Sequence, residues 1–186
     1  MEIELGRAKR ARRAYAFDDI AVVPSRRTRN TEDVSTAWSI DAFQFSIPVL
    51  GAPMDSVMSP RTAIMLGQLG GLGVLDLEGL WTRYDDPEPL LAEIAGLPDA
   101  SATRRMQELY AEPIKPELVR DRLAEIRAAG VTVAGSLTPQ RTQELYETVV
   151  AAGVDLFVIR GTTVSAEHVS SVDEPLNLKK FIYDLD

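Results

Sequence analysis

Hydrophobic positions along this chain fall into short uninterrupted runs, and three of these runs follow an amphipathic segment that ends in glycine. The three stretches are "AIMLGQLGGLGVL" (63–75), "LAEIRAAGVTVAG" (123–135) and "YETVVAAGVDLFVI" (146–159). Glycine is favoured directly after a helix because it readily adopts the left-handed conformation in which many helices end. Apolar runs without polar alternation are typical of strands covered on both faces, as in a parallel sheet. The pattern therefore predicts helices that alternate with parallel strands.

Adding the apolar run "IPVL" gives four predicted strands, over residues 47–51, 72–76, 131–135 and 155–160. The predicted helices cover residues 60–69, 87–95, 117–129 and 139–152, with a closing helix in "EPLNLKKFIYDL" (174–185). Two helices begin at Ser59-Pro60 and Thr138-Pro139, where a capping hydroxyl precedes a proline suited to the first helical position. Regular alternation of this kind predicts an α/β fold.

Two architectures fit the alternation, a doubly wound sheet and a (β/α)8 barrel. The glycines of "GGLGVL" (70–75) do not form the fingerprint G-x-G-x-x-G and come before a strand, which disfavours a doubly wound nucleotide-binding fold. We predict the N-terminal half of a (β/α)8 TIM barrel over residues 47–186, with parallel strands and outer helices. An N-terminal arm and lead-in segment covers residues 1–46. Functional groups of such barrels lie at the carboxyl ends of the strands.

Composition narrows the class of protein. The 186 residues are 45% hydrophobic and 26% charged, as in an ordinary soluble globular protein. A net charge of −8 argues against general affinity for nucleic acid. For the basic stretch "GRAKRARR" (6–13), a solvated arm is favoured over a contact with nucleic acid or phosphate. No apolar run approaches the ~18 residues of a membrane helix, and the charged N-terminus does not resemble a secretory signal, so a cytoplasmic location is expected. The absence of cysteine excludes disulfides and cysteine-based metal sites within this sequence, and no metal site is predicted.

The turn after the first predicted strand, "GAPMDSV" (51–57), holds an apolar methionine beside an acid. A turn that only reverses the chain favours small polar residues. The side chain of Met54 is flexible and polarizable, which suits contact with an aromatic face. From the residues alone, Met54 equally fits a ligand contact or a side chain that fills the mouth of the barrel.

Three motifs occur together in the order "AYAFDDIAVVPS" (14–25), "IPVLGAPMDSV" (47–57) and "LGGLGVL" (69–75). In combination they resemble the N-terminal half of the IMP dehydrogenase/GMP reductase family. Two further stretches, "YAEPIKPEL" (110–118) and "GTTVSAEHVS" (161–170), are similar to its IMP-dehydrogenase-related branch. The resemblance covers nearly the whole sequence.

The resemblance implies a (β/α)8 barrel, a purine nucleoside monophosphate (IMP, GMP or XMP), NAD or NADP as the cofactor, and a homo-oligomer, usually a tetramer. Many members carry two regulatory CBS modules after the second barrel helix. The matching span here, Pro98 to Pro116, is too short for them, so no CBS domain is expected.

The resemblance also implies roles for residues in two loops. Ala52, Met54 and Asp55 match the family's nucleotide-binding turn, in which the methionine packs against the purine. Asp55 is further expected to hold the loop or a nearby polar group.

Arg160, Gly161 and Thr162 fall at the position implied for the cofactor. The sequence departs from the family there, because typical members have an aspartate near the nicotinamide ribose where this chain has Arg160. A guanidinium cannot accept hydrogen bonds from ribose hydroxyls, although it pairs well with a phosphate or a carboxylate.

The implied activity is oxidation of IMP to XMP with NAD, or reduction of GMP to IMP with NADPH. In both reactions a cysteine attacks C2 of the nucleotide, and a hydride moves between C2 and the nicotinamide. The family's cysteine and phosphate-binding glycines correspond to positions beyond Asp186. We therefore expect no catalytic residue within residues 1–186, and we expect this portion alone to be inactive and unstable as a free-standing domain. The alternatives are a non-catalytic nucleotide-binding or assembly subunit of the same family and, less favoured, an unrelated barrel such as a flavin oxidoreductase.

Overall fold

The structure, a computed structural model, describes residues 2–4, 7, 10–24, 26–161 and 176–185. The chain divides into two compact units, Met1–Ser35 and Thr36–Asp186. In the first unit, β1 (Glu2–Glu4) pairs antiparallel with β2 (Arg10–Arg12), and two single 3-10 turns follow, η1 (Phe17–Asp19) and η2 (Thr31–Asp33).

The second unit begins with a β-hairpin of two three-residue strands, β3 (Trp38–Ile40) and β4 (Phe43–Phe45). Asp41 in its turn has a φ of 48°, in the left-handed region that tight hairpin turns require. Trp38 stacks on the opposite Phe45 with ring centroids 4.6 Å apart, and its indole N–H donates to the carbonyl of Ile47 at 2.7 Å. This hairpin was not predicted, and it lies within residues 1–46, the range that sequence analysis assigned to the arm and lead-in segment.

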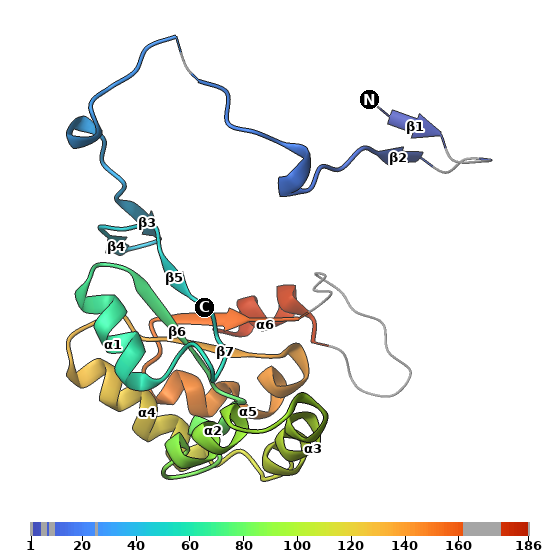
Figure 1. The fold of residues 1–186 in the computed structure, drawn as a ribbon, viewed down its shortest axis with the longest axis vertical. Helices are drawn as coiled ribbons and strands as arrows, with labels where there is room; N and C mark the ends of the chain where they lie inside the picture. The colour runs from blue at the N-terminus through green and yellow to red at the C-terminus, as the bar shows by residue number, and fades with distance from the viewer. Residues whose placement is uncertain (1, 5–6, 8–9, 25, 162–175, 186) are drawn as a thin grey trace. The chain divides into compact units, whose positions relative to one another are not determined.

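Four parallel strands follow in sequential order: β5 (Leu50–Gly51), β6 (Leu72–Asp76), β7 (Ala134–Leu137) and β8 (Leu156–Ile159). The helices between them are α1 (Pro60–Gln68), α2 (Glu88–Ala95), α3 (Asp99–Tyr110), α4 (Pro116–Ala128) and α5 (Pro139–Ala151); the 3-10 turn η3 (Leu80–Thr82) follows β6, and α6 (Leu178–Leu185) comes last (Figure 1). Ser59 and Thr138 cap α1 and α5 as predicted, by accepting from the amides of Thr62 and Arg141. This order confirms the predicted α/β fold with parallel strands, in an arrangement consistent with half of a (β/α)8 barrel.

The two faces of the sheet are covered differently. Alternate strand residues such as Leu75 and Leu137 pack with buried side chains of α1, α4 and α5, among them Leu123 and Val149. These three helices lie along one side of the sheet in Figure 1. The opposite strand positions include Leu72, Val74 and Ala134, which cluster with Phe45 and the rest of the β3–β4 hairpin. The hairpin therefore covers part of the inner face of the sheet.

Two predicted strands differ from the structure by more than one residue at an end. The first is shorter than predicted, because Pro48 has no amide to donate to a neighbouring strand, and only Leu50 and Gly51 pair with β6. The third starts at Ala134 and not at residue 131, because the amide of Val133 is bound by the Asp155 carboxylate at 2.8 Å.

A helix that was not predicted, α3, fills the span that a CBS insertion would occupy. Its apolar positions at Ala102, Met106, Leu109 and Tyr110 have the spacing of one helix face, so the signal was present in the sequence.

Candidate functional site at the carboxyl ends of the strands

The turn after β5 brings Met54 to an exposed position. Its backbone is closed locally: the amide of Met54 donates to Ala52 at 2.9 Å, and the amides of Val57 and Met58 both donate to the carbonyl of Met54. Ala52 is exposed, and the Met54 side chain is 45% exposed although it is large and apolar. Met58 is buried beneath the turn, so Met54 itself is not needed to fill the core there.

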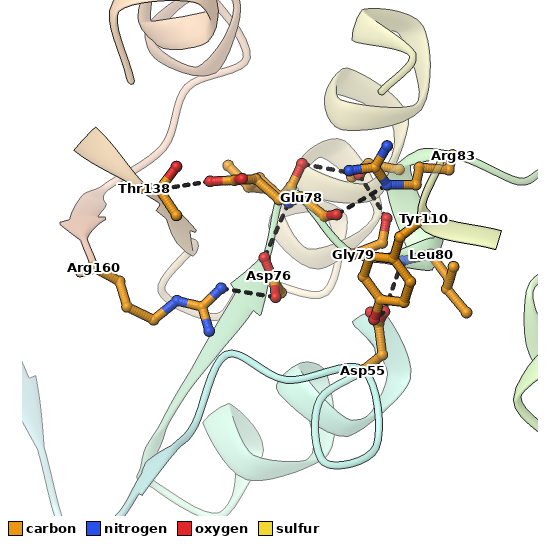
Figure 2. A network of polar contacts seen from close by, with 11 residues as sticks. Asp55, Asp76, Glu78, Gly79, Leu80, Arg83, Tyr110, Thr138 and Arg160 are labelled. Atoms are coloured by element: carbon orange, nitrogen blue, oxygen red, sulfur yellow. Dashed lines mark hydrogen bonds and ion pairs between the residues drawn. The ribbon is translucent and has the colours of Figure 1, made fainter. Parts of the chain in front are cut away.

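Asp55 points from the turn toward two other elements. One carboxylate oxygen, Oδ2, accepts a hydrogen bond from the amide of Leu80 at 2.7 Å and another from the Tyr110 hydroxyl (Figure 2). The other oxygen, Oδ1, is buried without a hydrogen-bond partner among the described residues. Gly79 lies against it so closely that a Cβ added there would stand 2.1 Å from Oδ1. Asp55 thus joins the turn after β5 to η3 and to the end of α3.

Asp76 and Arg160 meet on the inner face of the sheet. Side chains alternate between faces along a strand, so Asp76 shares the face of Leu72 and Val74, and Arg160 shares that of Leu156 and Val158. Arg160 Nη2 lies 2.9 Å from Asp76 Oδ2, with the two side chains 40% and 11% exposed. The other oxygen of Asp76 accepts from the amide of Glu78 at 3.0 Å, so both oxygens of this carboxylate have a partner.

Glu78 and Arg83 extend these contacts to the neighbouring loops. The Glu78 carboxylate accepts from the amide of Thr138, after β7. Arg83 donates through Nε to the carbonyl of Glu78 at 3.0 Å and through Nη1 to the carbonyl of Glu112, after α3. As Figure 2 shows, the side chains of Asp55, Asp76, Glu78 and Arg160 and the backbone amide of Thr138 therefore take part in a row of polar contacts at the carboxyl ends of the strands.

A cavity of about 600 Å³ opens beside the turn. Its lining residues come from the turn, the end of β6, η3 and the helices α2 and α3: Met54, Asp55, Ser56, Asp76, Leu80, Leu91, Ile94, Ala95, Met106 and Tyr110. Most of these side chains are apolar, and the carboxylates and the phenol supply a few polar groups, a mixture typical of small-molecule sites.

Burial changes the protonation equilibria of two lining groups. Burial raises the pKa of Asp76 above the ordinary aspartate value, and the Glu78 amide and the Arg160 guanidinium only partly oppose it. Burial, followed by the hydrogen bond to Asp55, raises the pKa of the Tyr110 phenol. The phenol therefore stays protonated at neutral pH and is a permanent donor to Asp55.

The structure places the predicted residues in two groups. Met54 and Asp55 line the cavity, with Ala52 in the same turn. Arg160 lies at the end of β8, where its amide donates to the carbonyl of Leu137 at 2.8 Å, and Gly161 follows it in an exposed position. Thr162 lies outside the described residues.

Sequence reasoning did not single out three residues of this region. Asp76 is the last residue of β6 and Ser136 the next to last of β7, and two-residue alternation with Val74 and Ala134 would have placed both on the inner face. The hydroxyl of Ser136 is buried without a hydrogen-bond partner among the described residues. Tyr110 was missed because α3 itself was not predicted.

Two negative results apply to the part of the chain that the structure describes. None of its helices combines the length and the apolar character needed to cross a membrane. It also holds no group of three or more acidic, histidine or cysteine side chains arranged to bind a metal ion.

Comparison with known proteins identifies relatives of this chain. A family model described as IMP dehydrogenase / GMP reductase domain matches residues 14–177. A protein named uncharacterized oxidoreductase from Mycobacterium tuberculosis is 52% identical over 189 residues, covering 99% of this chain and 50% of the relative. Inosine-5'-monophosphate dehydrogenase from Methanocaldococcus jannaschii is 37% identical over 65 residues, 35% of this chain and 13% of that protein.

A solved structure shows the same arrangement. The crystal structure of an IMP dehydrogenase/GMP reductase-like protein from Corynebacterium glutamicum superposes with a TM-score of 0.87 and 44% sequence identity, covering 100% of this chain and 50% of that chain. The chain thus spans about half the length of the relatives that match all of it.

Proposed function

Because this chain belongs to the IMP dehydrogenase/GMP reductase family, we propose that it supplies the purine-contacting turn of an oxidoreductase acting on IMP, GMP or XMP. The observation that carries the proposal is the exposure of Met54 at the carboxyl end of the sheet, next to a cavity of about 600 Å³. Ligands of barrel proteins bind at that end of the strands.

Met54 suits one face of a purine base. Its thioether is polarizable, and its exposed position leaves the sulfur accessible to a planar ring. The backbone bonds to the carbonyls of Ala52 and Met54 fix the turn, so little conformational freedom would be lost when a base is bound. Ala52 in the same turn has a small side chain, which leaves room for the purine ring.

The proposed cofactor is NAD or NADP, at Arg160 and Gly161. The described residues here can bind only part of such a molecule. The Arg160 guanidinium can only donate hydrogen bonds, and both carboxylate oxygens of the adjacent Asp76 already have a partner, Arg160 for one and the Glu78 amide for the other. This rim therefore fits a phosphate of the cofactor better than a ribose diol, which needs an acceptor. When bound, a nicotinamide would exchange a hydride with C2 of the nucleotide.

Two reactions remain open within the proposal, oxidation of IMP to XMP with NAD and reduction of GMP to IMP with NADPH. Covalent attack on C2 needs a thiol, and this sequence contains no cysteine. The nucleophile and the phosphate-binding loops would come from the other half of the length seen in the relatives. The working form would be a cytoplasmic homo-oligomer, such as a tetramer. A second candidate, a non-catalytic nucleotide-binding or assembly subunit, is favoured by Arg160 standing where an acceptor would bind ribose.

Binding of IMP, GMP and XMP to the intact protein tests the proposal by titration calorimetry. We expect Met54→Ala to weaken binding by about fivefold, since it removes one apolar contact with the base. Met65→Ala is the matched control, because Met65 is a similarly exposed methionine on α1 that does not line the cavity. Unchanged affinity in Met54→Ala, or no binding of any of the three nucleotides by the parent protein, would overturn it.

A further inference from the structure

We propose that Tyr110 of α3 is a positioning residue for the purine-contacting turn: its hydroxyl holds the Asp55 carboxylate and thereby fixes the orientation of Met54. This inference rests on the proposed function for its ligand, but the contact itself is a property of the chain alone. It gives the α2–α3 hairpin (residues 88–110) a role in nucleotide affinity.

The Asp55 carboxylate is the group through which Tyr110 contacts the turn. Asp55 Oδ2 accepts from the Tyr110 hydroxyl and from the amide of Leu80 at 2.7 Å, so one oxygen is held by donors from two elements. Hydrogen bonds to an ionised carboxylate are stronger than those between neutral groups. Asp55 directly follows Met54, so the direction of the carboxylate constrains the backbone that carries the methionine.

Tyr110 is itself held in place from its other side. The Arg83 guanidinium lies 5.6 Å from the centroid of the Tyr110 ring, and Arg83 is bonded to the carbonyls of Glu78 and Glu112. A second phenol, that of Tyr84, donates to the backbone carbonyl of Leu109 at 3.0 Å and not to the Asp55 carboxylate. The contacts of Arg83 therefore hold Tyr110 as a fixed donor to Asp55.

Within the described part of the chain, the backbone hydrogen bonds of the turn are internal, between Ala52, Met54, Val57 and Met58, and Met58 packs in the core with Ala63 of α1. Asp55 supplies the polar link from this turn to η3 and α3. Loss of the Tyr110 hydroxyl would leave the Leu80 amide as the one described donor to Asp55 Oδ2.

The test compares two variants of the intact protein that each remove one phenolic hydroxyl hydrogen-bonded near the end of α3. Tyr110→Phe removes the bond to Asp55, whereas the control Tyr84→Phe removes the bond to Leu109 and leaves Asp55 untouched. We expect Tyr110→Phe to weaken IMP or GMP binding by about fivefold, the effect of one net hydrogen bond, and Tyr84→Phe to bind like the parent. Equal losses in the two variants, or none in Tyr110→Phe, would overturn the proposal.

A double-mutant cycle separates action through Asp55 from direct contact with the ligand. If Tyr110 acts through Asp55, then Tyr110→Phe has no further effect on affinity once Asp55→Ala is present. If Tyr110→Phe weakens nucleotide binding as much in the Asp55→Ala protein as in the parent, Tyr110 contacts the ligand directly and the positioning role is refuted.

Hydrogen exchange without any nucleotide makes the result independent of the proposed function. We expect the amides of Val57 and Met58 to exchange faster in Tyr110→Phe than in Tyr84→Phe, because the turn opens more often. Unchanged exchange would refute the positioning role even if nucleotides bind. Faster exchange in a protein that binds no purine nucleotide would sustain it and refute the proposed function instead.

Discussion

Arg160 at the end of β8 lies 2.9 Å from Asp76 at the end of β6, although β7 stands between their strands. The pair spans the sheet because both residues occupy inward positions and Arg160 is long enough to reach across Ser136. The Asp76 side chain is only 11% exposed, and the cost of burying its carboxylate is thereby offset by the guanidinium of Arg160 from the other side of β7. This pair joins the side of the site proposed for the nucleotide to the side proposed for the cofactor.

Removal of Arg160 should destabilise the protein at neutral pH. Arg160→Met leaves the largely buried Asp76 without its cationic partner, and because Arg160 is 40% exposed we expect a loss of about 1–2 kcal/mol, below the cost of breaking a fully buried pair. Calorimetric melting of the intact protein measures the change. An unaltered melting temperature would show that the pair contributes nothing to stability.

The same variant should show a changed dependence of stability on pH. The pKa of Asp76 is higher in the folded protein than in the unfolded chain. Protonation of Asp76 therefore adds to the free energy of unfolding. The full contribution is present below the unfolded-state pKa and is lost as the pH rises through the folded-state pKa. Arg160 lowers that pKa, so Arg160→Met raises it further. The deficit of the variant should therefore be small in acid and largest at neutral pH. Melting curves across this window check it, and adding Asp76→Asn should abolish the difference in slope.

Gly79→Ala should be costly, because Gly79 is buried in the loop between β6 and η3. The backbone there is ordinary, with a φ of −79°, but the new Cβ would stand 2.1 Å from Asp55 Oδ1 and 2.7 Å from its Cγ. Moving Asp55 away would break its two hydrogen bonds, so we expect a loss of about 1–3 kcal/mol in stability. Chemical denaturation measures it. Gly96→Ala is the control, since its Cβ would meet nothing closer than 3.5 Å.

Asp155→Ala should reduce stability without altering nucleotide affinity. Asp155 lies at the amino end of β8, where Oδ2 binds the amide of the buried Val133 at 2.8 Å and Oδ1 pairs with the half-exposed Arg127. The unpaired amide should account for most of a loss of about 1–3 kcal/mol. Thermal melting and IMP titration of the same preparation measure the stability and the nucleotide affinity. Weakened binding would contradict the expectation that only the carboxyl ends of the strands take part in ligand binding.

Residues 1–186 expressed alone should be inactive and should not behave as a stable monomer. β5 and β8 are the outer strands of the sheet, and all four residues of β8 are only partly buried, whereas those of β7 are fully buried. Unpaired strand edges promote association. Size-exclusion chromatography, calorimetry and nicotinamide absorbance with IMP or GMP test this. A cooperatively melting monomer would refute the first half of the prediction, and turnover above background the second.

The fold could be predicted from local patterns because each βα unit repeats the same signals. Gly70, Gly130 and Gly153 follow helices with φ values of 90°, 73° and 78°, as the helix–glycine–strand pattern requires. The β3–β4 hairpin escaped prediction because Trp38–Ile40 and Phe43–Phe45 are each three residues long, shorter than a detectable alternation.

The site was less predictable because its contacts join residues far apart in sequence. Met54 and Asp55 stood out in an unusual turn, but the partner of Asp55, Tyr110, is 55 residues away on an unpredicted helix. The carboxylate that pairs with Arg160 is likewise 84 residues away. The first pairing depends on how α3 packs beside the turn, and the second on the register between strands; a single sequence reveals neither.

The sequential strand order has a consequence for how the protein is made. Each strand of the β5–β6–β7–β8 sheet pairs only with its immediate predecessor and successor along the chain. Sheets built from neighbouring units need no distant segment before they begin to form, and domains of a nascent polypeptide fold from the N-terminus as the ribosome delivers them. We expect β6, α4 and β7 to begin to assemble while later residues are still being translated, so that the contact of Glu78 with the Thr138 amide can form before synthesis is complete.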